Sequence, residues 1–363
     1  FCRGSARPGF SATHSVGEQI TLLEKLSNAV AVSGDEREVR LIVLDEIKPF
    51  ADDIKIDALG NVLAVRKAKD PGAMRVMLAA HMDEIGFMLV ESEEGGWFHF
   101  ELVGGIDPRQ LVGKTVLVGK DHLPGIIGAK PIHLTDHDEL ERALSVDSLR
   151  IDLGPQNGKK AEPGDRATFA TRFQQVGPSL MGKALDNRLG VASVIHLLKN
   201  CPPNVELLAA FTVQEEVGLR GARVAAYTFN PDLAIALDST PAYDLPAWDG
   251  EENSRYNTRL GSGPAIYISD SSTLSDPRLI RHLAETGKAL SIPFQFRQPG
   301  GGGTDAGAIH KVRAGIPSVS VSVPGRYAHT ACGLARTEDW QHTLALIYHA
   351  LERVTPEILA AER

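Results

Sequence analysis

Two adjacent carboxylates, Glu215 and Glu216, directly follow an apolar run from Val205 to Val213. Side chains alternate between faces along a regular strand, so neighbouring acids can face one point only where the strand ends and the backbone turns. If such a pair is buried, it needs a cation or a shared proton, because like charges out of water repel strongly. Taken alone, the pair is more typical of a solvated turn. Other stretches that end in the same way favour a buried site.

Further polar groups occupy similar positions. The apolar stretch 75–80 ends in His81 and Asp83, five apolar residues precede Asp238, and the run 318–323 leads to His329. The H-x-D spacing suits a metal-binding imidazole whose ring is oriented by a nearby carboxylate, although a lone H-x-D is more often structural. Asp186 opens a helical pattern, where a simple helix cap is the alternative explanation.

These groups favour a site with two metal ions. The carboxyl ends of strands in an open α/β sheet lie along one edge, where ligand sites form. Two histidines with several carboxylates suit zinc, cobalt or manganese. The set exceeds the three protein ligands of a mononuclear catalytic zinc. Two metals that share one carboxylate account for five groups and leave one carboxylate as a base. The six groups are His81, Asp186, Glu215, Glu216, Asp238 and His329.

Composition narrows the class of protein. The chain has 363 residues, enough for two domains with a large core. Its net charge of −8 argues against nonspecific nucleic-acid binding. No apolar run reaches the ~18 residues of a membrane span. The three cysteines are far apart, which fits a reducing compartment, and we expect a cytoplasmic protein.

Periodicity predicts the elements that must position these groups. A helical pattern begins at Glu18, and Ser33 and Glu36 have the S-x-x-E spacing of a capping box for a second helix. Asp276 and Pro277 supply the cap and first turn of a later helix. Apolar runs predict buried strands at 61–66, 75–80, 205–213, 233–237 and 318–323. A final amphipathic helix contains Trp340.

The segment between positions 87 and 181 has a different texture. Short alternating runs are broken by glycine and proline turns, which predicts an all-β module, a small barrel or sandwich, inserted into an α/β domain. We therefore expect an α/β fold with a mixed, mainly parallel sheet flanked by helices. Its catalytic domain would be discontinuous, comprising residues 18–86 and 182–363. Residues 1–17 would be an N-terminal extension, either a transit-peptide remnant or a truncated or added start.

A run of four glycines, Gly300 to Gly303, precedes Thr304. It lacks the Lys-Ser/Thr of a phosphate loop, so a nucleotide site is disfavoured. Backbone that approaches a substrate closely and a plain flexible loop both remain open explanations.

Several motifs in order resemble the co-catalytic metallo-aminopeptidases of the glutamyl and deblocking type, whose members include the tetrahedral (TET) assemblies. The resemblance covers nearly everything from Glu18 onward. The motifs are Ser-Gly-Asp-Glu (33–36), Ala-His-Met-Asp-Glu-Ile-Gly (80–86), Lys-Pro-Ile-His-Leu (130–134), Leu-Asp-Asn-Arg-Leu-Gly (185–190), Gln-Glu-Glu-Val-Gly-Leu-Arg-Gly (214–221), Leu-Asp (237–238), Gly-Gly-Thr-Asp-Ala (302–306) and Val-Pro-Gly-Arg-Tyr-Ala-His (323–329). The long gap between His81 and Asp186, which contains the β module, favours an aminopeptidase over related carboxypeptidases.

The resemblance implies a role for each group. Asp186 would bridge two metal ions, zinc in the first place, with cobalt or manganese as alternatives. His81 and Asp238 would complete the shell of one ion, and Glu216 and His329 the shell of the other. Glu215 would be the general base that takes a proton from a bridging water, and Asp83 would orient His81. The peptide bond between Asp186 and Asn187 would be cis.

The resemblance also implies partners. Substrates would be short peptides cleaved after their first residue, and the β module (87–181) would mediate dimers that build a tetrahedral dodecamer. A di-metal deacylase or N-blocked peptide hydrolase on the same scaffold is the alternative enzyme, and a pseudo-enzyme that has lost its metals is the non-enzymatic alternative. Arg220, Arg255 and Arg259 could favour acidic substrates, but each is as readily structural.

Overall fold

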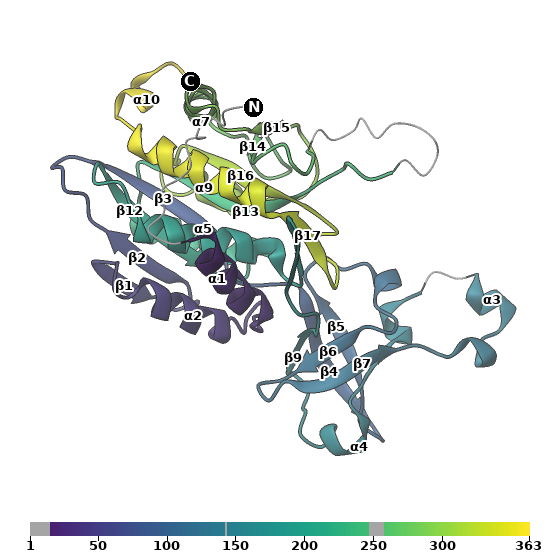
Figure 1. The fold of residues 1–363 in the computed structure, drawn as a ribbon. Helices are drawn as coiled ribbons and strands as arrows, with labels where there is room; N and C mark the ends of the chain where they lie inside the picture. The colour runs from purple at the N-terminus through teal and green to yellow at the C-terminus, as the bar shows by residue number, and fades with distance from the viewer. Residues whose placement is uncertain (1–14, 142–143, 247–257) are drawn as a thin grey trace.

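The computed structural model describes residues 15–141, 144–246 and 258–363. It comprises a large α/β domain and a separate β-barrel that lies at one end of it (Figure 1). The predicted extension 1–17 falls mostly outside the described residues. Ser15, which is described, caps the first helix. None of the helices in the described ranges is long and apolar enough to cross a membrane.

The large domain is built on an 11-stranded mixed sheet. Its central strands β12, β3, β13 and β16 run parallel, and antiparallel strands extend both edges. The main path follows the order β1 (Asp53–Ile56), β2 (Val62–Arg66), β12 (Val205–Thr212), β3 (Met74–His81), β13 (Leu233–Pro241), β16 (Ser318–Arg326), β17 (Gly333–Arg336), β11 (Ser179–Gly182) and β10 (Gln174–Val176). Off this path, β14 (Ala265–Tyr267) pairs with β16 and with β15 (Gln295–Arg297).

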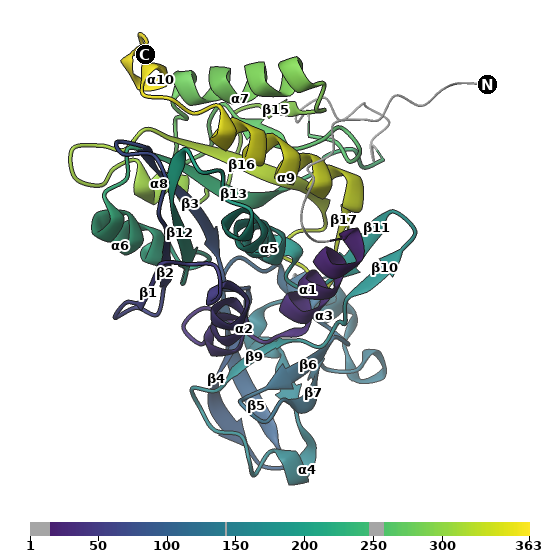
Figure 2. The same cartoon turned by 60° about the vertical axis from the view of Figure 1, so that its left-hand side comes forward.

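Helices cover both faces of this sheet, on opposite sides in Figure 2. One face packs against α1 (Val16–Asn28), α2 (Arg37–Ile47), α5 (Leu185–Lys199), α7 (Pro277–Leu290) and α9 (Thr337–Glu352); the other packs against α6 (Arg220–Phe229) and α8 (Ala306–Ile309). Alternate residues of a strand serve the two cores: Val76 and Leu78 pack toward the α5 side, Met77 and Ala79 toward the α6 side. The short α10 (Glu357–Ala360) ends the chain.

The inserted module is a closed six-stranded barrel. Phe87 packs edge-on against Phe100 and Phe169 at its centre, each with ring centroids 5.2 Å apart. Its strands, in order around the barrel, are β4 (Gly86–Glu93), β5 (Trp97–Val103), β8 (Arg150–Asp152), β7 (Leu123–Gly128), β6 (Thr115–Val118) and β9 (Arg166–Phe169). Short helices lie between them: η1 (Pro108–Gln110), η2 (Ile132–Leu134), α3 (His137–Leu140), η3 (Val146–Ser148) and α4 (Gly154–Asn157). The predicted fold class is confirmed. The barrel strands end at Phe169, and residues 174–182 pair into the large sheet.

The predicted capping box at Ser33 and Glu36 is wrong. Glu36 precedes α2 without making a side-chain cap, and the Ser33 hydroxyl donates instead to the Asp83 carboxylate at 2.6 Å. The same S-x-x-E pattern does form a capping box at Ser15 and Glu18, the start of α1. The helix α2 begins only at Arg37, so Ser33 lies three residues before its N-cap and its oxygen does not reach the amides of the first turn.

A buried charge cluster joins the barrel to the large domain. The Glu84 carboxylate accepts from Lys183 Nζ at 2.8 Å, Arg188 Nη2 at 3.1 Å, Thr168 Oγ1 at 2.9 Å and the Ala31 amide at 2.9 Å. Thr168 belongs to barrel strand β9, whereas the two cations flank the start of α5. Burial lowers the pKa of Lys183 to about 8, and it raises that of Glu84, but the two cations outweigh this and hold the carboxyl's pKa below its usual value.

We expect Glu84→Gln to lower the free energy of unfolding by about 3–5 kcal/mol, because it leaves two buried cations without their counter-charge. Chemical denaturation followed by circular dichroism measures this change. Glu93→Gln is the matched control: it removes a carboxylate from the exposed ion pair with Arg150 and should leave the transition midpoint in place. Equal effects of the two variants would contradict the assignment.

Candidate metal centre

Three adjacent strands direct polar side chains to one place. His81 is the last residue of β3 and lies in register with Thr212, the last residue of β12. Their alternation with the apolar core puts His81, Thr212 and Asp238 on the face that α6 and α8 cover. The carboxyl edge of the parallel strands therefore presents these groups together, as the sequence predicted.

The Glu215–Glu216 pair follows a sharp turn. β12 ends at Thr212, and Gln214 has a left-handed backbone with φ of 55°. The turn points the amides of Glu215 and Glu216 at the two carboxylate oxygens of Asp83, at 3.0 and 3.2 Å. The two consecutive acids thus converge where the strand ends and the backbone turns.

Asp186 lies at an irregular helix start. Ala184 is left-handed with φ of 53°, and Asp186 and Asn187 have non-helical dihedrals within the first turn of α5. The peptide bond between Asp186 and Asn187 is cis, as the resemblance implied. Asn187 anchors this turn by donating its side-chain amide to the Leu237 carbonyl at 2.9 Å. The alternative of a simple helix cap is not observed, because α5 has no side-chain cap and its N-cap residue is Ala184.

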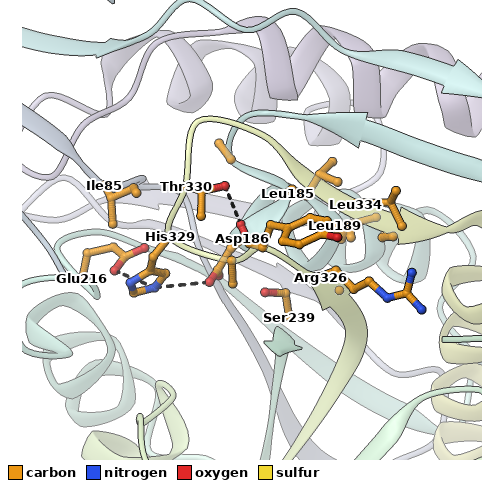
Figure 3. A pocket seen from close by; sticks show the side chains of 16 residues that line it. Ile85, Leu185, Asp186, Leu189, Glu216, Ser239, Arg326, His329, Thr330 and Leu334 are labelled. Atoms are coloured by element: carbon orange, nitrogen blue, oxygen red, sulfur yellow. Dashed lines mark hydrogen bonds and ion pairs between the residues drawn. The ribbon is translucent and has the colours of Figure 1, made fainter. Parts of the chain in front are cut away.

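His329 is brought in by the loop after β16. Tyr327 and His329 both have left-handed backbones, with φ of 62° and 57°. The ring donates Nδ1–H to the Gly105 carbonyl at 2.9 Å, which leaves Nε2 facing Asp186 and Glu216 (Figure 3). Gly105 lies in the loop after barrel strand β5, so the inserted module helps to hold this histidine.

The predicted groups form two neighbouring clusters. His81 Nε2 lies 3.4 Å from Asp186 Oδ1, 3.5 Å from Asp238 Oδ1 and 4.0 Å from Glu215 Oε2. In the second cluster, His329 Nε2 lies 3.5 Å from Asp186 Oδ2 and 3.4 Å from Glu216 Oε2 (Figure 3). Asp186 therefore turns one carboxylate oxygen toward each imidazole.

Asp83 supports both the first histidine and the paired acids. His81 donates Nδ1–H to the Asp83 backbone carbonyl at 3.2 Å, and the Asp83 carboxylate lies 3.6 Å from the same nitrogen. That carboxylate is fully buried and accepts from Ser33, Glu215 and Glu216. Although burial raises the pKa of Asp83, the contact with His81 and the hydrogen bonds from Ser33 and Glu215 outweigh it and hold the pKa low.

The site is electrostatically congested. Burial raises the pKa of Glu216 to about 8 and of Asp238 to about 6, and it raises that of Glu215 well above its usual value. Asp186 is the exception. Burial raises its pKa, but the contacts with His329 and His81 lower it by a larger amount, so that the net shift is downward. Burial alone would lower the pKa of His81, yet the surrounding carboxylates raise it. Without cations, these side chains must hold protons between them.

The donor set fits two divalent cations. Both histidines give Nδ1–H to backbone carbonyls, so each Nε2 is available as a ligand, a common arrangement in metal sites. His81, Glu215 and Asp238 make one group with ligand atoms within 4.8 Å of one another, and Asp186, Glu216 and His329 make a second. Mixed nitrogen and oxygen donors suit zinc, cobalt or manganese.

Other groups at the site escaped prediction from sequence. Asp305, at the start of α8, accepts from Thr212 Oγ1 at 2.5 Å, and burial raises its pKa to about 7. It lies within the Gly-Gly-Thr-Asp-Ala motif, for which the sequence predicts no role. The spacing around Ser33 predicts a helix cap rather than a contact with Asp83, and Gly105 belongs to no motif. Of the arginines considered for specificity, Arg220 and Arg259 do not line the pocket, and Arg255 lies outside the described residues.

A pocket of about 710 Å³ opens onto both clusters. Its lining combines the residues of both clusters with a wall from β14, β15, nearby loops and the glycine run. The wall residues include Tyr243, Tyr267, Ser271, Ser272, Arg297 and Gly301–Gly303. This volume is in the range of pockets that enclose small ligands.

Comparison with known proteins identifies the class of enzyme. A model of the M42 glutamyl aminopeptidase family matches residues 60–346, and the chain belongs to this family. It is therefore a peptide-bond hydrolase of the aminopeptidase type, and the resemblance stated from sequence is confirmed.

Individual relatives cover almost the whole chain. The lysyl aminopeptidase of Pyrococcus furiosus is 31% identical over 347 residues, which cover 92% of this chain and 97% of that protein. A TET aminopeptidase from a marine sediment archaeon of the Thaumarchaeota has a TM-score of 0.89 at 31% identity, covering 95% and 98% of the two chains. A TET peptidase of Pyrococcus horikoshii, described as able to assemble into a tetrahedron or a large octahedral shell, has a TM-score of 0.80 at 31% identity, covering 93% and 100%.

Cation affinity should rise with pH from about 6 up to about 10, the raised pKa of His329, because ligating histidines must lose a proton. The contact with Asp186 raises the pKa of His329, and the carboxylates around His81 raise its pKa as well. A raised histidine pKa extends the protonated range upward, so protons compete with the cation at neutral pH and compete less as pH rises. Calorimetric titration of metal-stripped protein with Zn²⁺, in buffers of different ionisation enthalpy, measures both affinity and proton release.

The control for this titration is His349→Gln, which removes a histidine paired with Glu352 on the far side of the large domain and should leave the profile unchanged. Affinity that is independent of pH, with no proton release, would contradict the expectation.

Proposed function

We propose that this enzyme removes the N-terminal residue of short peptides with the help of two divalent metal ions. The observation that supports this most directly is the placement of Asp186, whose two oxygens face two histidines at 3.4 and 3.5 Å. His81 and Asp238 would hold one ion and Glu216 and His329 the other, with Asp186 shared between them. Zinc is the first candidate, and cobalt or manganese suit the same donors.

Glu215 is the proposed general base. Paired divalent ions, when bound, polarise the scissile carbonyl and make water easier to deprotonate. Glu215 Oε2 would take the proton of the attacking water and return it to the departing amine. Its backbone amide is fixed by Asp83, and burial raises its pKa, so that proton transfer in both directions is accessible near neutral pH.

We expect Glu215→Gln to lower kcat by about 10²–10⁴-fold and to leave the metal content intact, because an amide cannot accept the proton. Hydrolysis of an amino acid p-nitroanilide gives kcat, and elemental analysis of the same sample gives the metal content. Glu216→Gln, which alters a proposed ligand, should instead lose metal. Glu206→Gln, on the strand β12 that leads to Glu215 but in an outer ion pair with Arg75, is the neutral control.

Full activity in Glu215→Gln, or metal loss equal to that of Glu216→Gln, would show that Glu215 is a ligand or a bystander. The same assay separates the alternative deacylase activity: an aminopeptidase cleaves peptides with a free amine, whereas a deacylase or N-blocked peptide hydrolase prefers the N-acetylated forms.

We further propose that the chain forms homo-oligomers, as dimers that assemble into a tetrahedral dodecamer. The shell-forming Pyrococcus horikoshii relative supports this, as do outward apolar side chains next to the barrel, Ile132 and Leu134, with exposed fractions of 74% and 61%. Light scattering after size-exclusion chromatography should give a mass near that of twelve chains. A monomeric mass at micromolar concentration would reject the assembly without affecting the proposed chemistry.

A further inference from the structure

Arg297 is a buried cation in the wall of the substrate pocket. It is the last residue of β15, its exposed fraction is only 4%, and it lines the same pocket as His81, Glu215 and Asp238. A buried guanidinium is rare unless a carboxylate compensates its charge.

Arg297 has no such partner among the described residues. Its Nη2 donates to the Gly301 carbonyl at 2.7 Å, its Nη1 makes a long contact of 3.5 Å with the Ser269 carbonyl, and its Nε has no acceptor. The Tyr267 ring stacks on it, with the guanidinium carbon 4.4 Å from the centroid. Arg188, the other arginine buried within the described ranges, does meet a carboxylate. Among the residues that the structure describes, only neutral groups contact the Arg297 guanidinium.

The surroundings leave room for an anion. At Gly301 and Gly302, a Cβ added to the backbone would meet no atom within 4 Å, so the glycine run borders open space beside the guanidinium. This favours the explanation that the run lets a substrate approach the backbone. Tyr267, which stacks on the guanidinium, lines the pocket together with Asp238. Burial raises the pKa of Tyr267 to about 12, against the opposing effect of Arg297.

We propose that Arg297 determines substrate specificity by pairing with the side-chain carboxylate of an N-terminal glutamate or aspartate. This inference rests on the proposed aminopeptidase function, in which the first residue of the peptide sits at the metal centre and its side chain points into the pocket. A planar guanidinium suits bidentate recognition of a carboxylate. Family membership does not decide the question, because relatives bear both glutamyl and lysyl names.

The acids on the pocket floor do not exclude an anionic substrate. Two divalent cations would balance the four charges of Asp186, Glu215, Glu216 and Asp238, so the loaded floor is formally neutral. Asp305 lies behind these residues, where it accepts from Thr212 and keeps its pKa near 7. The guanidinium then supplies the uncompensated charge on the pocket wall.

The test compares the α-p-nitroanilides of glutamate and glutamine, which differ in side-chain charge at nearly the same shape. Wild-type kcat/KM should favour the glutamate compound by at least ~10-fold, the lower range for a charge-assisted hydrogen bond. Arg297→Gln should reduce the glutamate value by about 10–100-fold and leave glutamine hydrolysis within a few fold. Arg297→Lys should retain part of the preference, since it keeps the charge but loses the fork.

Arg313→Gln is the matched control. Arg313 also stacks on a tyrosine, Tyr227, at 4.0 Å, but on the outer surface, so its loss should not alter the ratio. Because Arg297 is buried, melting temperatures of the variants are compared first. Calorimetric binding of free L-glutamate against L-glutamine to the wild type gives a second measure that needs no variant.

The outcomes separate the two proposals. If no aminoacyl p-nitroanilide is hydrolysed by metal-loaded wild type, the proposed function fails. If several are hydrolysed but glutamine or leucine compounds match glutamate, the specificity inference alone is overturned. A second result also overturns it: Arg297→Gln lowers kcat/KM for dipeptides with a free carboxyl terminus but not for the corresponding dipeptide amides. The guanidinium would then bind the C-terminal carboxylate of the substrate rather than the side chain of its first residue.

Discussion

The crowding of carboxylates around two imidazoles is the constraint on which the rest of the structure depends. Asp186, Glu215, Glu216 and Asp238 converge at one sheet edge with His81 and His329; His81 and Asp238 are buried, and the other three acids are half-buried. Like charges at such distances cannot all be ionised without compensation. The raised pKa values of Glu215, Glu216 and Asp238 and those of both histidines reflect the same excess of negative charge in the site. A pair of divalent cations removes both at once.

Such a site must be held together by parts of the protein that are stable without the cations. Left-handed backbone at Ala184, Gln214, Tyr327 and His329 aims the ligands, and each such residue costs roughly 1–3 kcal/mol. The buried core and the charge cluster around Glu84 offset this conformational cost. Arg188 donates to Glu84 and also to the Asp83 carbonyl at 3.3 Å, so the cluster that joins the domains also fixes the segment after His81.

Much of the site could be predicted from sequence, because its residues end apolar runs. The strand ends at His81, Glu215 and Asp238 follow from hydrophobic pattern alone, since parallel strands bring their carboxyl ends to one edge. The supporting contacts could not be predicted in this way. Ser33 matched a capping box, yet its hydroxyl meets Asp83, fifty positions away. Arg297 sits in a short strand with no motif, and only the folded structure shows that no carboxylate of the described part of the chain pairs with it.

The position of the barrel in the chain has a structural consequence. The barrel is inserted between His81 and Asp186, and two of its segments make contacts next to the candidate site. The Gly105 carbonyl, in the loop just after β5, accepts from His329, and Thr168 on β9 donates to Glu84, three residues after His81. The barrel therefore supports His329 directly and the His81 segment through Glu84. A displacement of the barrel would alter the acceptor of one histidine and the support of the other, so the geometry of the centre depends on how the barrel is held.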